Sequence, residues 1–316
     1  MAVTTNVYIR IVKCDMHVHS YYSGLCTTPF VKRFCRESYS DPQDVYSTLR
    51  RRGMTLFTLT DHDSIEGSEA LRGHPDFFLS EELTCRMPSG TEVHVGVYDF
   101  HERQHEQLQR RKDDMLSLIM YLTERKLFFS INHVFSSLTG PREIEDFSWF
   151  EEYFPAIETH NSHMLEGANA SAARLAQQWN KVGVGGSDAH ALASVGMAYT
   201  EVPGARNKAD FFAGLRSGFG RVAGDCGSFA RLTRDVLVIS AGLMREKAWT
   251  RLLAPLGLLV PLATAMNYYE ERAFDRRWAA RVLTHSRPKP RKATVSSYHV
   301  HTGHLAFQER AIASGG

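Results

Sequence analysis

The sequence has few cysteines, and their spacing gives them no structural role. Its 316 residues contain five cysteines, none of them in a C-x-x-C pair. An odd and unpaired set of this kind is not a disulfide framework, and it suits a reducing compartment. The first residues, Met-Ala-Val-Thr-Thr-Asn, lack a basic stretch followed by an apolar one. We therefore expect no signal peptide and a cytoplasmic location.

Two further absences narrow the range of functions. Neither G-x-G-x-x-G nor G-x-x-x-x-G-K-[ST] occurs, which argues against folds that hold nucleotide phosphates in a glycine-rich loop. Strong positive charge is also missing. Residues 267–316 have nine Lys or Arg and four Asp or Glu, and their net charge of +5 is partly offset by about −3 in residues 1–266. Long nucleic acid is therefore not an expected substrate, since many phosphate contacts need a basic groove.

Strand-like and helix-like segments alternate from residue 7 to about residue 225. Apolar runs that read as strands lie at 7–12, 54–63, 92–100, 127–134 and 156–161, and residues 182–190 read as a strand and a turn. Helical patterns lie at 42–52, 103–125, 165–179 and 208–216. Repeated strand-then-helix units are typical of an α/β fold with a parallel sheet. Their number favours a barrel over an open sheet.

The rest of the chain differs in pattern, which suggests three parts. Residues 1–229 would form the barrel, residues 230–285 a helical subdomain, and residues 286–316 a basic, flexible tail. The tail contains Y-H-V-H-T-G-H, which resembles a metal motif but has no strand before it, so we expect it to be solvated.

One segment of the helical part has no charge over 18 residues, from Leu252 to Tyr269. Its length alone would allow a membrane span. Pro255, Gly257 and Pro261 argue against a span, and we expect a helical hairpin that is buried or covered by a partner. A peripheral contact with a membrane or a protein is the alternative.

Residues that can bind metals follow most of the expected strands. They are His17 and His19, Asp61 and His62, Glu81 and Glu82, His94, His133, Glu158 with His160 and Asn161, and Asp188 with His190. An α/β barrel places its active site at the carboxyl ends of its strands, so these side chains should converge. Such a cluster is costly unless metal ions bind within it. The nitrogen and oxygen ligands suit Zn²⁺, Mn²⁺ or Fe²⁺, although a histidine in an apolar strand, such as His94 or His133, is also compatible with a structural role.

The order of these motifs carries a family resemblance. D-M-H-V-H-S, L-T-D-H-D and G-S-D-A-H occur in this order within residues 13–225, with S-E-E-L-T, E-V-H-V and I-N-H-V between them. In this combination the chain resembles the PHP (polymerase and histidinol phosphatase) superfamily of metal-dependent phosphoesterases. The resemblance implies a distorted seven-stranded β/α barrel, here with a C-terminal helical extension, and two or three divalent metal ions.

The resemblance also implies which residues hold each ion. The first ion would bind His17, His19, Asp188 and a glutamate that bridges to a second ion; the second would also bind His94 and His133, and a third would bind His62 and His190. For the bridge we favour Glu82, with Glu81 as the fallback, because the family pattern places the carboxylate directly before Leu83-Thr84.

Gly24 departs from the family pattern. Members commonly have an aspartate five residues after the second histidine, where it helps to hold the third ion, and this chain has glycine there. Asp61, Asp63 or Cys26 could replace it. The sequence leaves two and three metal ions as alternatives.

The expected reaction is hydrolysis of a phosphoester by a hydroxide that bridges two ions. The catalytic candidates are His62, Asp188 and His190, with the two histidines stabilising or protonating the leaving oxygen. Arg142 and Arg86 are candidates for phosphate binding by their proximity in sequence, or else ordinary surface arginines. His160 would contact substrate, support the ligands from behind, or be structural.

The expected substrate is a small phosphomonoester, a nucleotide or a short oligonucleotide. Two alternatives stay open. Amidohydrolase-type C–N hydrolysis uses similar clusters, but its bridging lysine should end a strand, and Lys126 and Lys181 precede strands. The other alternative is a non-catalytic metal-binding module that docks a partner or a membrane through residues 252–269.

Overall fold

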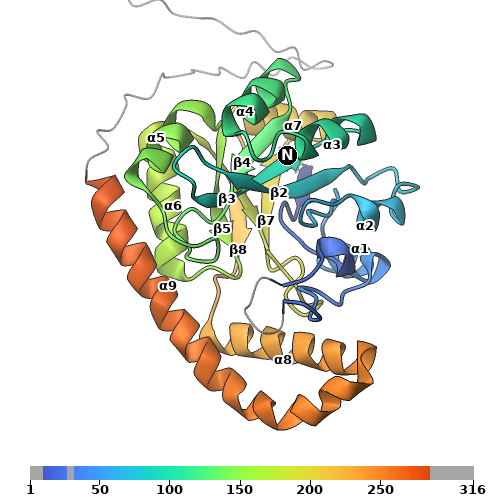
Figure 1. The fold of residues 1–316 in the computed structure, drawn as a ribbon. Helices are drawn as coiled ribbons and strands as arrows, with labels where there is room; N and C mark the ends of the chain where they lie inside the picture. The colour runs from blue at the N-terminus through green and yellow to red at the C-terminus, as the bar shows by residue number, and fades with distance from the viewer. Residues whose placement is uncertain (1–9, 27–31, 285–316) are drawn as a thin grey trace, which may run out of the picture.

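Strands occupy the middle of the molecule, and helices pack around them (Figure 1). The computed structural model describes residues 10–26 and 32–284. Helix α8 (Phe229–Glu246) crosses the underside, and α9 (Val260–Leu283) runs along one side of the body (Figure 1). Residues 7–9 of the first expected strand and the expected tail, 286–316, lie outside the described residues.

The strands form two sheets. One has the order β1 (Ile11–Cys14), β7 (Ala198–Pro203) and β8 (Arg221–Gly224), all antiparallel. The other has the order β2 (Ser80–Arg86), β3 (Glu92–Tyr98), β4 (Phe128–Ile131), β5 (Ala156–Asn161) and β6 (Val182–Gly186), with antiparallel pairing up to β4 and parallel pairing beyond it. The predicted α/β class is confirmed. A closed seven-stranded barrel is not confirmed, because the described residues form two separate sheets of three and five strands.

Short helices connect the strands. They are η1 (Tyr21–Ser23), α1 (Pro42–Arg51), α2 (Glu66–Glu69), α3 (Glu102–Gln109), α4 (Met115–Glu124), α5 (Ile144–Tyr153), α6 (Glu166–Trp179) and α7 (Lys208–Arg216). Helix α1 begins as its sequence predicts, because the Asp41 side chain accepts a hydrogen bond from Gln43 N and Pro42 occupies the first turn.

Two predicted elements differ in the structure. The segment 54–63 is extended but forms only isolated bridges, Phe57 to Phe77 and His62 to Glu82, so it is not a regular strand. The long helix predicted over 103–125 is two helices, α3 and α4. Asp114 separates them, because its side chain accepts from Ser117 N and so caps a new helix.

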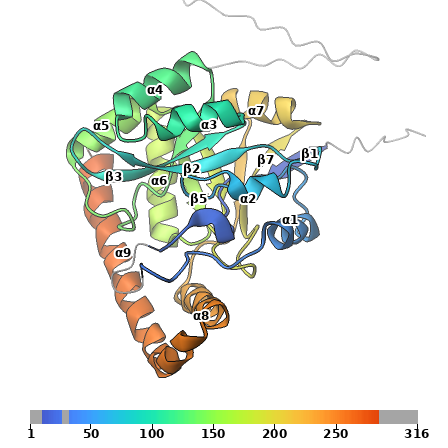
Figure 2. The same cartoon turned by 45° about the vertical axis from the view of Figure 1, so that its right-hand side comes forward.

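Helix α9 belongs to the largest hydrophobic core. Phe274, Trp278 and Val282 are buried in the cluster that also contains residues of β2 to β5 and α4 to α6. The Trp278 ring stacks on Phe147 of α5 at 5.3 Å between centroids. The C-terminal half of α9 is therefore anchored on the body, and Figure 2 shows α8 below the chain that connects β1 to α1.

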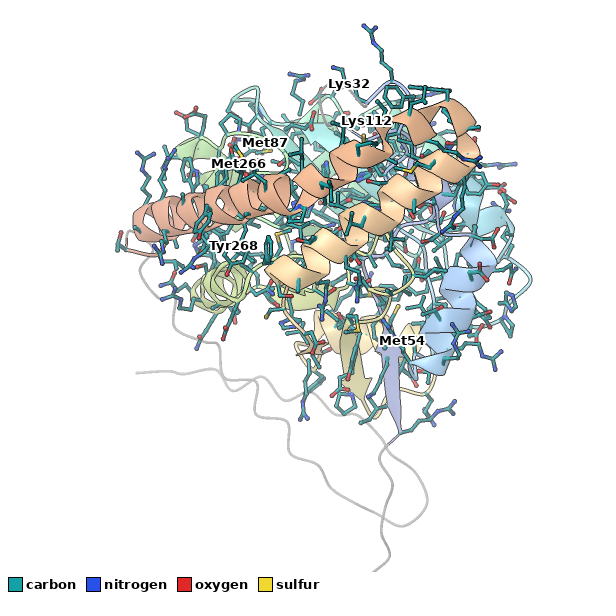
Figure 3. The ribbon with its side chains drawn as sticks, turned by 90° about the horizontal axis from the view of Figure 1, so that it is seen from below. Lys32, Met54, Met87, Lys112, Met266 and Tyr268 are labelled. Atoms are coloured by element: carbon teal, nitrogen blue, oxygen red, sulfur yellow. The ribbon has the colours of Figure 1, made fainter. Side chains whose placement is uncertain are left out.

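Helices α8 and α9 and the segment between them form a C-terminal helical extension, and the part of it that lies between α8 and the middle of α9 exposes apolar side chains. It contains η2 (Ala248–Leu259), where Leu252 and Leu258 are 85% and 86% exposed, and the first turns of α9, where Met266 is 66% exposed. Seen from below, α8 and α9 lie across this face, with Met266 and Tyr268 on α9 (Figure 3). The prediction of burial within the chain is wrong for this segment. The stretch Ala248–Leu283 is long and apolar enough to cross a membrane.

Candidate metal centre

The first two histidines are placed by the chain that leaves β1. This segment runs beside the end of β6: His19 N donates to Ala189 O at 3.1 Å and Asp188 N donates to His17 O at 2.6 Å. A Cβ atom at Gly186 would lie 2.3 Å from His17 N. Only glycine at that position allows the two segments to approach so closely, which brings the H-x-H and G-S-D-x-H motifs together.

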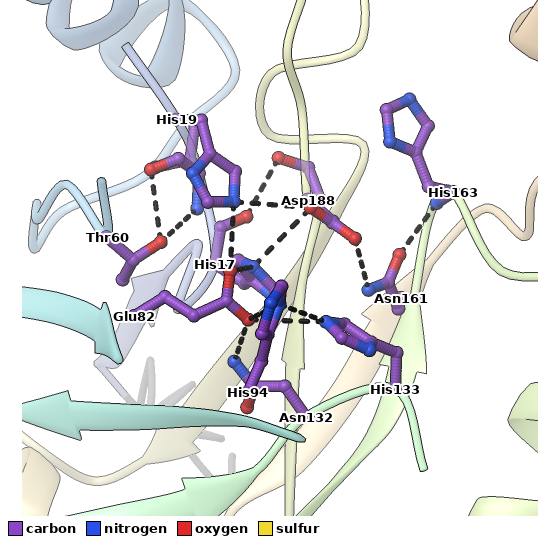
Figure 4. A network of polar contacts seen from close by, with 12 residues as sticks. His17, His19, Thr60, Glu82, His94, Asn132, His133, Asn161, His163 and Asp188 are labelled. Atoms are coloured by element: carbon purple, nitrogen blue, oxygen red, sulfur yellow. Dashed lines mark hydrogen bonds and ion pairs between the residues drawn. The ribbon is translucent and has the colours of Figure 1, made fainter. Parts of the chain in front are cut away.

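Glu82 lies at the centre of the cluster, with both carboxylate oxygens facing imidazoles (Figure 4). Its Oε2 is near His17 Nε2 (3.1 Å), His19 Nε2 (3.5 Å) and His62 Nδ1 (3.3 Å), and its Oε1 is near His94 Nδ1 (3.4 Å) and His133 Nε2 (3.3 Å). The two oxygens thus face two different groups of histidines. A carboxylate in this position can bridge two metal ions.

The neighbouring Glu81 points away from the cluster, because successive side chains of a strand alternate between its faces. Its carboxylate accepts from His105 Nδ1 at 2.9 Å and from Gln109 Nε2 at 2.8 Å, both on α3. The structure therefore brings Glu82, and not the fallback Glu81, to the predicted position.

Asp188 completes the group around the H-x-H pair. Its Oδ1 lies 3.4 Å from His17 Nε2, 3.3 Å from His19 Nε2 and 3.8 Å from His190 Nδ1. The backbone φ is +53° at Asp188 and +28° at His133. Non-glycine residues rarely adopt such values, and backbone strain of this kind is concentrated at functional sites.

Buried acceptors behind the cluster orient the first two imidazoles. His17 Nδ1 lies 2.8 Å from Glu158 Oε1, and His19 Nδ1 lies 2.8 Å from Ser23 Oγ, which itself donates to Asp61. Because these partners accept from Nδ1, the network assigns the proton to Nδ1 and leaves each Nε2 with a lone pair that faces the cluster.

The unpartnered atoms of the cluster test whether metal ions fit it. The buried atoms that lack a hydrogen-bond partner include His17 Nε2, His19 Nε2, His62 Nδ1 and Glu82 Oε2. These atoms face one another, and four groups of three of the surrounding side chains have ligand atoms within 4.8 Å of one another. Buried acceptors that face acceptors are unfavourable without a cation between them. The residues present therefore fit divalent metal ions.

The imidazoles of the cluster keep the carboxylates of Glu82 and Asp188 ionised. Burial alone would raise the pKa of Glu82 and of Asp188, but the surrounding imidazoles, His17 foremost, outweigh it and hold both pKa values well below the usual range. Burial lowers the pKa of His62 well below its ordinary value and that of His190 to about 3. At His17 and His133 burial also acts to lower the pKa, but the neighbouring carboxylates, Glu82 foremost, outweigh it and raise the pKa. Carboxylates that are ionised and imidazoles that are neutral are the forms that bind metals.

Three further candidates are placed away from the cluster's ligand atoms. Asp61 is buried and accepts from Ser20 N, Ser20 Oγ and Ser23 Oγ. Asp63 pairs with Lys112 at 2.9 Å and accepts from Thr84 N. His160 lies on β5 beside a register shift, and none of the contacts within the described residues joins it to the cluster.

The two arginines predicted to bind phosphate differ in their exposure to solvent. Arg142 is buried, and its guanidinium donates to the backbone oxygen of Glu92 and to Thr139 Oγ1. These bonds tie the guanidinium to the start of β3 and to the loop before α5, and its role in phosphate binding stays a prediction. Arg86 is exposed at the end of β2, and its role in phosphate binding stays a prediction.

Two residues at the site were not predicted. Glu37 Oε2 lies 3.2 Å from His62 Nε2, and the His163 ring stacks on His190 at 5.9 Å between centroids. His163 Nε2 also lies 3.1 Å from the buried carboxylate of Asp235 on α8. Glu37 follows no apolar run and belongs to no motif, so nothing in the local sequence indicates it. His163 lies three residues after His160, and its position just past a predicted strand was the available signal.

The solved structure of PsfC agrees with this fold. PsfC from Pseudomonas syringae superposes with a TM-score of 0.51 and 16% identity, covering 76% of this chain and all of PsfC. The lesion-specific endonuclease PfuEndoQ from Pyrococcus furiosus gives a TM-score of 0.46 and 13% identity over 67% of this chain and 58% of its own. The likeness to PsfC concerns the fold alone.

Two sequence matches are more local. An uncharacterized protein of Methanocaldococcus jannaschii is 26% identical over 82 residues, which is 26% of this chain and 44% of that protein, so the match spans less than half of its length. Residues 166–219, which include the G-S-D-A-H motif, match the family model PHP_C, described as PHP-associated. With this match and with its H-x-H, T-D-H-D and G-S-D-x-H motifs meeting at one centre, the chain is similar to the PHP superfamily.

Proposed function

We propose that this protein is a metal-dependent hydrolase that cleaves a phosphoester of a small molecule, a nucleotide or a short oligonucleotide. The observation that carries the proposal is the position of Glu82, whose two oxygens face two separate groups of buried imidazoles. His17, His19 and Asp188 would hold one ion with Glu82, and His94 and His133 would hold a second.

Divalent ions in such a centre supply Lewis acidity, which activates water and neutralises the charge that develops on phosphoryl oxygens. The chain's own residues hold the ligands in the correct form. Glu158 keeps the His17 proton on Nδ1, and Asn161 Nδ2 donates both to Glu158 Oε2 at 3.0 Å and to Asp188 Oδ2 at 3.1 Å. Asn161 therefore keeps these two carboxylates in place.

His62 and His190 border the centre on the more exposed side. Their side chains are 15% and 18% exposed, whereas that of His17 is 1% exposed. His190 Nδ1 lies 3.0 Å from the backbone oxygen of Asp188, so the imidazole has one fixed orientation and presents Nε2 outward. We infer that the substrate enters here and that these two imidazoles act on its leaving oxygen, either directly or through an ion that they would hold. The cytoplasmic location stays a prediction.

The test combines metal analysis with turnover. Purified protein reconstituted with Mn²⁺ would be analysed for bound metal and assayed on phosphomonoesters, nucleoside bisphosphates, short phosphodiesters and N-acyl amino acids. We expect at least two ions per chain and hydrolysis in one of the phosphoester classes. Full metal occupancy with no phosphoester turnover would refute the proposal, and turnover of the amide substrates alone would assign C–N hydrolysis.

His133→Ala provides the matched site variant, because His133 faces only the Oε1 side of Glu82. We expect the variant to lose one ion and at least about 100-fold in kcat, since removing a single electrostatic contribution to a transition state costs on this order. Glu145→Gln, at an exposed position in the first turn of α5, serves as the control and should behave as wild type.

A further inference from the structure

The chain beside Gly24 brings a carboxylate to the third metal position. The segment 24–26 pairs with the segment 35–37: Glu37 N donates to Gly24 O at 3.2 Å, and Cys26 N donates to Cys35 O at 3.0 Å. Leu25 and Arg36 form an isolated antiparallel bridge between the two segments. Glu37 is therefore the direct neighbour of the residue that lacks a side chain.

The Glu37 side chain is directed at His62 and His190, the two histidines that the family resemblance assigns to a third ion. Its Oε2 lies 3.2 Å from His62 Nε2 and 3.9 Å from His190 Nε2. This oxygen is buried and has no hydrogen-bond partner. A carboxylate oxygen that faces two imidazole nitrogens without a partner has the arrangement of a metal ligand.

The three replacements suggested by the sequence are engaged elsewhere. Both oxygens of Asp61 accept from serines, and Asp63 pairs with Lys112. The thiol of Cys26 is hydrogen-bonded to that of Cys35. None of the three is directed at both His62 and His190.

We propose that Glu37 is the carboxylate ligand of a third metal ion, held with His62 and His190, and that it replaces the aspartate missing at Gly24. This rests on the metal centre of the proposed function. The ligand comes from a different segment of the chain, so the third site depends on how that segment is held.

Helix α8 of the C-terminal extension contacts the segment that contains Glu37. Glu246, the last residue of α8, accepts from Arg36 Nε at 3.1 Å and from Tyr21 Oη at 3.2 Å. The Arg36 guanidinium lies over the Tyr21 ring at 3.7 Å, and α8 packs Gly242 so closely against Tyr39 that a Cβ there would lie 2.5 Å from the ring. Helix α8 thus fixes the residues on both sides of Glu37, and we infer that it regulates occupancy of the third site.

The experiment counts metal ions in the full-length protein, so it does not depend on activity. Wild type, Glu37→Gln and the surface control Glu145→Gln would be loaded with Mn²⁺, dialysed and analysed by plasma mass spectrometry. We expect three ions per chain in wild type and in the control, and two in Glu37→Gln. Circular dichroism would confirm that the variant is folded.

A second variant covers the case in which Glu37→Gln does not fold. Glu246→Gln leaves every proposed ligand in place and removes the ion pair with Arg36. Titration with Mn²⁺ should show an affinity for the third ion that is lower by about tenfold, the smaller end of the effect of an outer-shell change, with the other two sites unchanged.

The outcomes separate the two proposals. Wild type without bound metal would refute the proposed function itself. Two ions in wild type, or three ions retained in Glu37→Gln, would overturn the assignment of Glu37 and leave the binuclear centre standing. An unchanged third affinity in Glu246→Gln would overturn the role of α8.

Discussion

The buried carboxylate of Asp235 connects α8 to the rim of the metal centre, and its removal should have a measurable cost. Asp235 is 1% exposed and accepts from Ser194 Oγ, from His163 Nε2 at 3.1 Å and from Arg234 Nε at 3.0 Å. A hydrogen bond to a charged group contributes about 1.5–3 kcal/mol, and a buried donor left without an acceptor costs about 1–3 kcal/mol.

Asp235→Asn keeps the shape of the side chain but replaces one acceptor by a donor. Either Arg234, which bonds Oδ1, or both Ser194 and His163, which bond Oδ2, then lose their acceptor. We expect the free energy of unfolding to fall by about 2–3 kcal/mol. Urea unfolding followed by circular dichroism would measure it. Asp225→Asn is the matched control, because Asp225 pairs with Arg231 while 59% exposed, and such pairs contribute no more than about 1 kcal/mol.

A second readout distinguishes this contact from general packing. The hydrogen bond of His163 Nε2 should weaken in Asp235→Asn, because its acceptor either loses its charge or is replaced by a donor, and the ¹⁵N spectrum of the imidazole should shift accordingly. An unfolding free energy within 0.5 kcal/mol of wild type, or an equal loss in the Asp225 control, would refute the reasoning, since surface changes stay within about that range.

The remaining predictions concern single positions. His17→Ala should remove the ion held by the H-x-H pair and abolish turnover, measured by metal analysis and activity; unchanged stoichiometry would contradict the assignment. Gly186→Ala should lower metal affinity without changing any ligand, because the added Cβ displaces the His17 backbone, and calorimetric titration would show it. Arg142→Met should lower the free energy of unfolding by about 2–4 kcal/mol, because it leaves two buried acceptors unpaired. An unchanged KM of the folded variant would argue against a role of Arg142 in phosphate binding. Co-sedimentation with anionic liposomes that is lost in a Leu252→Glu, Leu258→Glu double variant would support a membrane contact of the exposed extension, and no binding by wild type would exclude it.

The sequence was most informative where ligands lie within short motifs after apolar runs. His17, His19, His62, Glu82 and Asp188 were predicted as one cluster, and the structure brings their ligand atoms together. The positions of these ligands can be predicted from such motifs, because a strand determines the direction of the side chains at its end. Whether each residue binds metal stays a prediction.

The sequence was least informative where long-range contacts decide the outcome. Glu37 reaches the site only because the segments 24–26 and 35–37 pair, and no periodic pattern encodes that pairing. The apolar run at 54–63 has the composition of a strand, yet its backbone bonds go to scattered partners such as Lys13 and Asp76. Arg142 follows His133 in sequence, but its guanidinium turns into the protein to bond Glu92 O.

The hairpin that joins β2 to β3 also sets which glutamate reaches the metal centre. Its turn is closed by Met87 N donating to Thr91 O at 2.8 Å, and the ladder then pairs Glu82 with Gly96. Side chains alternate along a strand, so a register slip of one residue would turn Glu82 outward and Glu81 inward. A one-residue deletion between Met87 and Thr91 would therefore disable the centre while leaving every ligand in the chain. The length of this distant turn is as much a requirement for the site as the identity of the ligands.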